Sequence, residues 1–398
     1  MRNVKDSGIE WIGFVPDTWD INPISCYFKE RNEKVSDYDW EPLSVTKQGI
    51  VKQLDNATKS DAHDARKKVC KNDFVINSRS DRKQSCGVSP YDGSVSLINI
   101  VLQPKNILPE YVNYLLKNYG FAEEFYRYGS GIVADLWSTN YQKMKKIMIP
   151  VPSINEQEKI AYFLDEKIKE IDNAIEKTKE TIEDYKKLKY SIIVNYITKG
   201  IKKESKLIDS QINWIGNYPE TWIKTKLKQF CKINNGKEII NELSPESEFK
   251  IEVFGSGGVF KYTDQELYEG ESVLFGRKGT LGKPLYVNQK FWTVDTMYYL
   301  TFNDSKLLPK YCYYQLIAFD WNPYITQTAL PSIVGSTILN CDFVFPSIKE
   351  QQEIVQYLDK KCNEIDKLIE SKENIVNELE NYKKSVIYEY VTGKKEVK

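Results

Sequence analysis

Two long stretches of the chain carry apolar residues at steps of three and four, the period of one face of an α-helix. Lysine, glutamate and aspartate occupy most of the positions between them. The apolar positions are Ile160, Leu164, Ile168, Ile171, Ile175, Ile182 and Tyr185 in the first stretch, and Ile354, Leu358, Cys362, Ile365, Ile369, Val376 and Leu379 in the second. Such a narrow apolar seam is typical of a coiled coil. The pattern predicts two long helices with charged outer faces.

Both predicted helices have start and stop signals. Each begins after a proline with a serine three positions before a glutamate, the capping-box arrangement; the pairs are Ser153 with Glu156 and Ser347 with Glu350. Gly200 and Gly393 follow the last turns, where a left-handed cap favours glycine. A helix over 153–197 would be roughly 65 Å long, too long to bury its seam against one small domain. We therefore expect the two seams to pack against each other, antiparallel, as a structural rod or as a spacer.

The regions outside these helices show shorter, strand-like patterns mixed with short helices. The strand-like runs are Phe74–Ile76 and Val95–Leu102 in the first region, and Val273–Phe275 and Met297–Phe302 in the second. Each region also contains Leu-Pro-x-Tyr, beginning at Leu108 and at Leu308, with the proline suited to a first helical turn. The two regions therefore share a mixed α/β plan.

Much of the chain is repeated. Residues 152–198 match residues 346–392 at a constant offset, beginning with Pro-Ser-Ile and Glu-Gln in both copies. A second repeated motif opens each copy: Trp11-Ile12-Gly13 with Pro16 and Trp19, then Trp214-Ile215-Gly216 with Pro219 and Trp222. The regions enclosed by these repeats hardly match each other. Repetition of this kind decides the architecture, and it indicates one scaffold that holds two different binding domains.

We therefore predict an α+β fold with a pseudo-two-fold internal repeat. Two mixed α/β domains would be separated by two long helices packed as an antiparallel coiled coil. The predicted boundaries are 1–150 for the first domain, 151–200 for the first helix, 201–344 for the second domain and 345–398 for the second helix.

Composition limits the classes of function. The 56 basic and 56 acidic side chains balance, which argues against tight autonomous nucleic-acid binding, since phosphate neutralisation supplies most of that affinity. The seven scattered cysteines lack a CxxC pair, so we expect reduced thiols and no zinc site. No segment approaches eighteen consecutive apolar residues and the N-terminus lacks a secretion signal, which predicts a cytoplasmic protein without membrane contact.

The best candidate site is a pair of basic segments that follow strand-like runs. A scarce arginine at a strand end suits bidentate contact with guanine, with neighbouring lysines and hydroxyls on phosphate. We align Arg79 with Arg277, the only arginine of the second region; solvated loops are the alternative. The candidate DNA-binding residues are Arg66, Lys67, Lys68, Arg79, Ser80, Arg82, Lys83, Arg277, Lys278, Thr280 and Lys283.

Catalytic motifs are not found in the sequence. Gly276 to Lys283 has one residue too many for a phosphate-binding loop and no Ser or Thr after the lysine. Asn322-Pro323-Tyr324 lacks the second proline of the motif that amino-methyltransferases use. The single histidine, His63, has no evident partner for base catalysis or metal binding. We therefore expect no catalytic, cofactor or metal site in this chain.

The repeated motifs, taken in order, resemble the specificity subunits of type I restriction–modification systems over essentially the whole chain. The resemblance rests on the Trp-Ile-Gly…Pro…Trp motif and on the helix start Pro-x-x-x-Glu-Gln, each present twice. It implies that each α/β domain is a target-recognition domain reading one half of a split DNA sequence. Because the two domains differ, the bipartite target should be asymmetric, with the helices setting the unread spacing.

The resemblance also implies partners that supply the chemistry. Two modification subunits would bind S-adenosylmethionine, flip an adenine out of the duplex and methylate N6. Restriction subunits with translocase and nuclease activity would use ATP and Mg in defence against phage. The helix residues expected to serve as spacer or partner contacts are Glu156, Gln157, Ile160, Leu164, Ile171, Ile175, Glu350, Gln351, Ile354, Leu358, Ile365 and Ile369.

Two other classes of function stay open at this point. A non-catalytic coiled-coil scaffold whose two α/β domains bind proteins would show no sequence-dependent DNA affinity. A self-contained methyltransferase or nuclease is disfavoured by the missing motifs.

Overall fold

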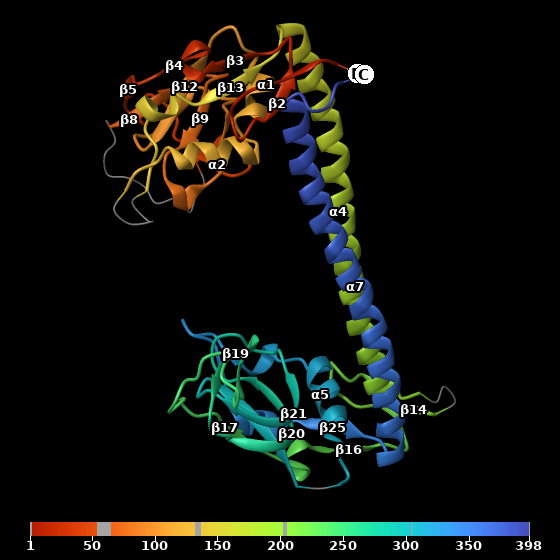
Figure 1. Cartoon of the computed structure of the whole chain (residues 1–398). Helices are drawn as coiled ribbons and strands as arrows, with labels where there is room; N and C mark the ends of the chain where they lie inside the picture. Colours follow the sequence, from red (N-terminus) through yellow and green to blue (C-terminus); the bar gives the residue numbers. More distant parts are fainter. Residues whose placement is uncertain (1, 54–64, 132–136, 202–204, 304, 398) are drawn as a thin grey trace. The chain divides into compact units, whose positions relative to one another are not determined.

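The computed structural model describes residues 2–53, 65–131, 137–201, 205–303 and 305–397 (Figure 1). His63, considered above as a catalytic base, lies outside the described residues. The chain forms two compact units, residues 1–178 with 374–398 and residues 179–373. Each unit contains an α/β domain and part of each long helix, so the units divide both helices. The domain boundaries predicted above, which treat each helix as its own segment, stay a prediction.

The two long helices are α4 (Ile154–Lys199) and α7 (Ile348–Val391), each beginning one residue after its predicted serine. Gly200 and Gly393 follow them in the left-handed region, with φ of 71° and 70°, which is the conformation expected of a glycine C-cap. Among the described residues, no helix is long and apolar enough to cross a membrane.

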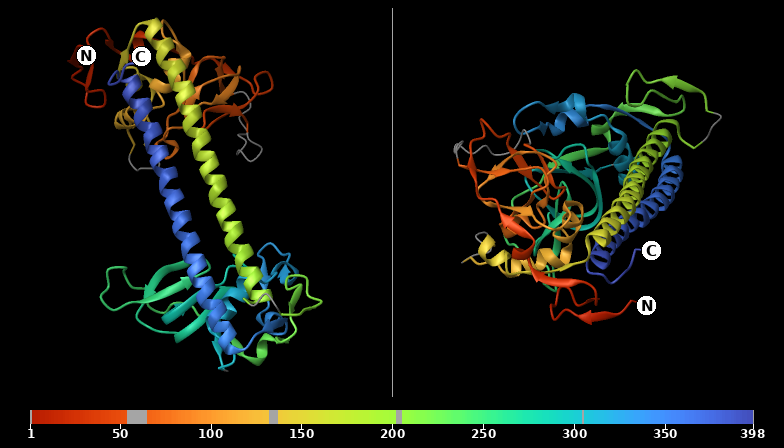
Figure 2. Two further views of the ribbon diagram at one scale, coloured as in Figure 1. Left: turned by 90° about the vertical axis from the view of Figure 1, so that its right-hand side faces the viewer. Right: turned by 90° about the horizontal axis from the view of Figure 1, so that it is seen from above.

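Within the first unit, the N-terminal part of α4 packs against the C-terminal part of α7. The rings of Phe163 and Tyr390 lie 4.5 Å apart, and Asp172 pairs with Lys383 at 2.6 Å. Positions that advance along α4 therefore meet positions that retreat along α7, which defines an antiparallel pair. Figure 2 shows the two helices side by side.

Within the second unit, the remaining parts of the two helices pair in the same way. The rings of Tyr196 and Tyr357 lie 4.3 Å apart, and Lys189 pairs with Asp366 at 2.6 Å. These residues occupy the repeat-equivalent positions of the pairs in the first unit. The predicted antiparallel coiled coil is confirmed in each unit separately.

The apolar seam is largely buried, as the helical period predicts. The buried seam positions are Ile160, Leu164, Ile171, Ile175, Ile182, Ile354, Leu358, Cys362, Ile365 and Val376, and the half-buried ones are Ile168, Tyr185, Ile369 and Leu379. A fully buried leucine contributes about 1.5–3 kcal/mol relative to an exposed one. Seam burial is therefore a main source of helix stability.

The first domain is built from short antiparallel strands. Its main sheet has the order β10-β9-β12-β4 and a second sheet has the order β11-β8-β5. The strands are β1 (Val4–Asp6), β2 (Phe14–Pro16), β3 (Asp20–Pro23), β4 (Phe28–Glu30), β5 (Lys34–Val35), β6 (Leu43–Val45), β7 (Ile50–Lys52), β8 (Arg66–Val69), β9 (Phe74–Asn77), β10 (Cys86–Val88), β11 (Gly93–Ser96), β12 (Asn99–Pro104) and β13 (Met148–Val151). The helices are α1 (Pro109–Leu115), α2 (Tyr119–Arg127) and α3 (Tyr141–Met144).

The prediction of one strand over Val95–Leu102 is wrong. The run contains two strands, β11 and β12, which belong to different sheets. Leu97 is exposed at the break, and the Asn99 amide donates to the Ser96 carbonyl at 3.0 Å to close the turn. Because Leu97 and Ile98 are apolar, the hydrophobic pattern alone does not mark this turn.

The second domain is built around one six-stranded sheet with the order β17-β22-β20-β21-β18-β19, in which β18 and β21 are parallel. The strands are β14 (Leu207–Asp209), β15 (Asn217–Pro219), β16 (Ile223–Lys226), β17 (Cys231–Asn235), β18 (Ile251–Gly255), β19 (Gly258–Thr263), β20 (Tyr268–Gly276), β21 (Leu285–Thr293), β22 (Met297–Phe302), β23 (Ile325–Thr326), β24 (Ser332–Ile333) and β25 (Asp342–Phe345). The helices are α5 (Pro309–Ala318) and α6 (Gly335–Leu339).

Candidate nucleic-acid interface

The basic segment of the first domain leaves the buried strand β9. Phe74, Val75 and Ile76 are almost fully buried, and the chain emerges three residues later at the exposed Arg79. The Arg79 backbone N–H donates to the Asn77 side-chain oxygen at 3.0 Å, which fixes the turn out of the sheet. The strand therefore directs the Arg79 backbone to the domain surface.

The other basic residues of this segment are mostly engaged with acids. Arg82 pairs with Asp81 at 3.5 Å, with both side chains well exposed. Lys83 forms a close ion pair with Glu123 of α2 and lies 5.8 Å from the centre of the Tyr126 ring. Ser80 is half-buried. Arg79 has no carboxylate partner within the described part of the chain, which leaves it the most available cation here.

In the second domain, Arg277 lies directly after β20, and two neighbouring side chains hold its guanidinium in place. Its guanidinium carbon is 5.6 Å from the centre of the Tyr298 ring, and its Nη1 lies 3.5 Å from the Asn235 side-chain oxygen. No carboxylate pairs with it among the described residues. A half-buried guanidinium held by a ring and an amide keeps donors free for an external acceptor. Lys278, Thr280 and Lys283, the remaining predicted residues, are exposed.

Backbone pairing shows which positions of the two segments are equivalent. Arg79 forms an antiparallel bridge with Ser138, and Lys278 forms the same bridge with Ser332. Arg79 therefore corresponds to Lys278, and the predicted alignment of Arg79 with Arg277 is wrong by one position. The parts of the two strands directly before these segments, Phe74–Ile76 of β9 and Val273–Phe275 of β20, are buried on both faces and apolar throughout, so no alternation of polar residues fixes their register.

Arg66 and Lys67 are turned into the protein. Only 8% of Arg66 and 9% of Lys67 is exposed. The Arg66 guanidinium donates to Ser94 at 2.8 Å, and the Lys67 ammonium donates to the Asn99 carbonyl at 2.9 Å. Burial lowers the pKa of Arg66. Contact of either residue with DNA would break these internal bonds, so we remove both from the candidate interface.

Lys68 is held on the outer side of the same strand. Its ammonium pairs with Glu33 at 3.1 Å and lies 4.3 Å from the centre of the Trp40 ring. The three basic residues at 66–68 thus brace β8 against its neighbours. In the sequence they read as a basic patch because the pattern does not show which way each side chain points.

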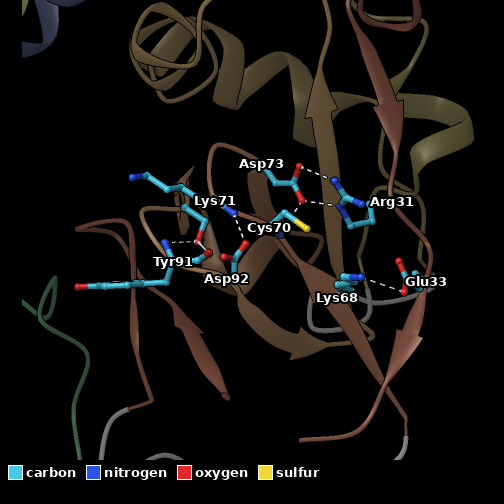
Figure 3. A network of polar contacts seen from close by, with 9 residues as sticks. Arg31, Glu33, Lys68, Cys70, Lys71, Asp73, Tyr91 and Asp92 are labelled. Atoms are coloured by element: carbon cyan, nitrogen blue, oxygen red, sulfur yellow. Dashed lines mark hydrogen bonds and ion pairs between the residues drawn. The ribbon is translucent and has the colours of Figure 1, made fainter. Parts of the chain in front are cut away.

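A polar network around the buried Asp73 holds the turn between β8 and β9 (Figure 3). Arg31 donates to both oxygens of Asp73, at 2.6 and 3.2 Å, and Asp73 also accepts the Cys70 backbone N–H at 2.8 Å. The hydrogen bond to Asp73 raises the pKa of Arg31. Asp92 accepts the Lys71 N–H at 2.9 Å. The network fixes the start of β9 and so supports the basic segment at its other end.

The glutamine of each Glu-Gln motif is an internal clamp. Gln157 and Gln351 are 1% and 0% exposed. Each accepts the N–H of the first residue of a Leu-Pro-x-Tyr motif, from Leu108 and from Leu308, at 2.9 Å. Each also donates to the carbonyl of the proline before its helix. These residues position the long helices on the domains and are not exposed to an outside partner.

The two glutamates of these motifs have different surroundings. Glu156 accepts the Trp19 indole N–H at 3.0 Å and pairs with Arg2 at 2.5 Å. The corresponding indole nitrogen of Trp222 is buried without a hydrogen-bond partner among the described residues. The repeated opening motif therefore keeps its packing but not all of its polar contacts.

The tyrosines of the Leu-Pro-x-Tyr motifs join the domains to the ends of the long helices, a role that was not predicted from the sequence. Together with the two glutamines they belong to the repeated frame, by which we mean the long helices and the contacts that hold them to the domains. Tyr111 is fully buried, and its hydroxyl donates at 3.2 Å to the carbonyl of Val391 at the end of α7. Tyr311 is equally buried and donates at 3.4 Å to the carbonyl of Ile197 near the end of α4. Recurrence of the tyrosine at the same motif position was the available signal.

Comparison with known proteins agrees with this duplicated arrangement. The family model described as type I restriction modification DNA specificity domain matches twice, over residues 21–184 and 219–381. The type I restriction enzyme MjaVIII specificity subunit of Methanocaldococcus jannaschii is 26% identical over 253 residues, which are 56% of this chain and 57% of that protein. The putative MjaX specificity subunit of the same organism is 23% identical, over 61% and 58% of the two chains. The matched region thus spans less than two thirds of either relative.

The fold also matches a solved structure. A chain from work on the complex assembly and conformational transition of the type I R-M system superposes with a TM-score of 0.71, at 14% identity, over 95% of this chain and 98% of that one. At 14% identity, this similarity shows that the two chains share a fold. Because the family model covers most of both repeats, this chain belongs to the family of type I restriction–modification DNA specificity proteins.

Proposed function

We propose that the chain is the DNA-specificity subunit of a type I restriction–modification complex and that it reads a bipartite, asymmetric duplex target. Each α/β domain would read one half-site. The observation that carries this proposal is a repeated frame, with the same glutamine and tyrosine contacts in both copies, that holds two different sheets. Each sheet has an available cation after a central strand. Arg79 and Lys278 occupy the equivalent position, and Arg277 stands one position earlier.

The proposal extends to partners. Two modification subunits would bind S-adenosylmethionine and methylate adenine N6, and restriction subunits would supply ATP- and Mg-dependent translocation and cleavage. This chain would contribute recognition and assembly, without a reaction of its own. Its balanced charge fits a subunit whose partners share the phosphate contacts.

A genome-wide map of N6-methyladenine in the host, with the gene intact and deleted, tests the proposal. We expect deletion to abolish methylation at one split motif with two unlike halves. An unchanged map, together with failure to co-purify a modification subunit, would overturn it in favour of a protein-binding scaffold.

The role of the helices as a spacer has its own test. Equal in-register insertions in both helices, near residues 176–184 of α4 and the paired part of α7, should lengthen the unread gap and leave both half-sites intact. Unchanged spacing would mean that the coiled coil only supports the domains.

A further inference from the structure

A small hairpin of the second domain lies beside the basic segment and was not singled out in the sequence. It consists of β23 and β24, and the residues at its tip from Gln327 to Leu330 are exposed. The Thr326 hydroxyl oxygen accepts the Ser332 N–H at 3.1 Å, and the Thr328 hydroxyl donates to the Leu330 carbonyl at 2.8 Å. These bonds hold the tip in a defined shape, which reduces the entropy lost on binding.

The hairpin is joined to the basic segment by backbone hydrogen bonds. The Ile333 N–H donates to the Arg277 carbonyl and the Gly279 N–H donates to the Pro331 carbonyl, both at 3.0 Å. Tyr298 links the same two parts, since its ring lies beside the Arg277 guanidinium and its hydroxyl donates to the Ile333 carbonyl at 3.4 Å. The hairpin and the basic segment therefore form one continuous surface.

This surface carries free groups of several kinds. The Gln327 amide makes no hydrogen bond within the described part of the chain, and Leu330 is 57% exposed. Lys278 is exposed and, in the same part of the chain, has no carboxylate partner. An exposed acid, Asp295, precedes Thr296, whose carbonyl accepts the Arg277 N–H at 2.8 Å. The surface thus offers an amide, an apolar side chain and two cations, with one acid nearby.

Those groups match the edges of base pairs. The major groove, about 12 Å wide, admits a two-stranded ribbon, and a glutamine amide pairs bidentately with adenine N6 and N7. An apolar side chain suits the thymine methyl group, and lysine suits phosphate. A protein ligand would not require an exposed amide on the same surface as two cations that lack carboxylate partners among the described residues, so duplex DNA is the favoured occupant.

We infer that the β23–β24 hairpin enters the major groove of duplex DNA and that Gln327 determines one base of the half-site read by the second domain. The inference rests on the proposed function and specifies which element of the second domain contacts the bases. Adenine is the base that the Gln327 amide fits best. Leu330 would lie against a thymine methyl group, and Lys278 would neutralise a phosphate.

The test is to map adenine methylation in a gene-deleted host complemented with the wild-type chain or with Gln327→Ala. We expect the preference for one base of one half-site to fall roughly tenfold, with the other half-site unchanged. Gln327→Glu gives a second readout, because a carboxylate accepts from cytosine N4 and should shift the preference from adenine to cytosine.

Gln265→Ala is the matched control. Gln265 is exposed and lies before the start of β20, at the strand end remote from Arg277. It should leave the motif unchanged, and all three variants should unfold at the wild-type temperature because both glutamines are exposed. A split wild-type motif that neither Gln327 variant alters at any position would overturn the inference alone. A wild-type methylation map without a split motif would overturn the proposed function, on which the inference rests.

Discussion

In the first unit Tyr111 donates its hydroxyl to the end of α7, and in the second unit Tyr311 donates its hydroxyl near the end of α4. Gln157 and Gln351 clamp the start of the opposite helix in each unit through the same acceptor and donor roles. The sheets that these contacts support differ in strand number and order.

The contrast between the shared helix contacts and the unlike sheets separates two kinds of constraint on the residues of this chain. The frame glutamines and tyrosines are buried and hydrogen-bonded, so a change at one of them leaves an unpaired buried group. Arg79 and Lys278, which follow β9 and β20, are exposed and have no carboxylate partner among the described residues, so these positions can vary without loss of the frame. A repeat can therefore keep its scaffold while its binding surfaces diverge.

The largest effect should come from the seam. Leu164 and Leu358 are repeat-equivalent and fully buried, so Leu164→Ala and Leu358→Ala should each destabilise the chain by about 2–5 kcal/mol. Denaturant unfolding measures this, with the exposed Leu188 changed to alanine as the control. Losses that differ by more than about 2 kcal/mol between the two variants would show that the two units do not share one frame.

The glutamine clamps should rank next. Gln157→Ala and Gln351→Ala each leave a buried N–H and a buried carbonyl without a hydrogen-bond partner. Each unsatisfied group should lower the free energy of unfolding by about 1–3 kcal/mol. Gln351 also donates to the Lys306 carbonyl at 2.8 Å, so its loss should be the larger. Thermal unfolding of both variants decides the order. Equal stability to wild type would exclude a clamp role.

The binding surfaces should respond in specificity and not in stability. Arg277→Ala should cost about 1–3 kcal/mol in discrimination at one position of one half-site, and Arg79→Ala should affect only the other half-site. Competition binding by the assembled complex on variant duplexes measures both. Arg66→Ala serves as the contrast, because its buried bonds to Ser94 predict lost stability without a change in sequence preference.

The smallest effect should come from the ion pairs of the coiled coil. Asp172 with Lys383 and Lys189 with Asp366 are partly exposed, and exposed pairs contribute about 0.2–1 kcal/mol. Double-mutant cycles on each pair should give similar small couplings that weaken in high salt. A coupling above about 2 kcal/mol in one unit alone would make that pair a specific part of the frame.

Much of the frame could be predicted because it depends on local patterns that occur twice. Apolar spacing located both helices, and serine and glycine located their ends to within two residues. The same repetition pointed to the antiparallel pairing, since two equivalent seams can cover each other. The family resemblance followed from motifs that, in the structure, hold the helices to the domains.

The binding surface was decided by tertiary structure. Arg66, Lys67 and Arg79 look alike in the sequence, yet strand pairing turns the first two inward and leaves the third exposed. The register of Arg277 depends on its bonds to a hairpin more than fifty residues later, and no local pattern encodes such a partner. Periodicity specifies which face of a helix is buried, whereas the direction of a cation at a strand end depends on which strands become its neighbours.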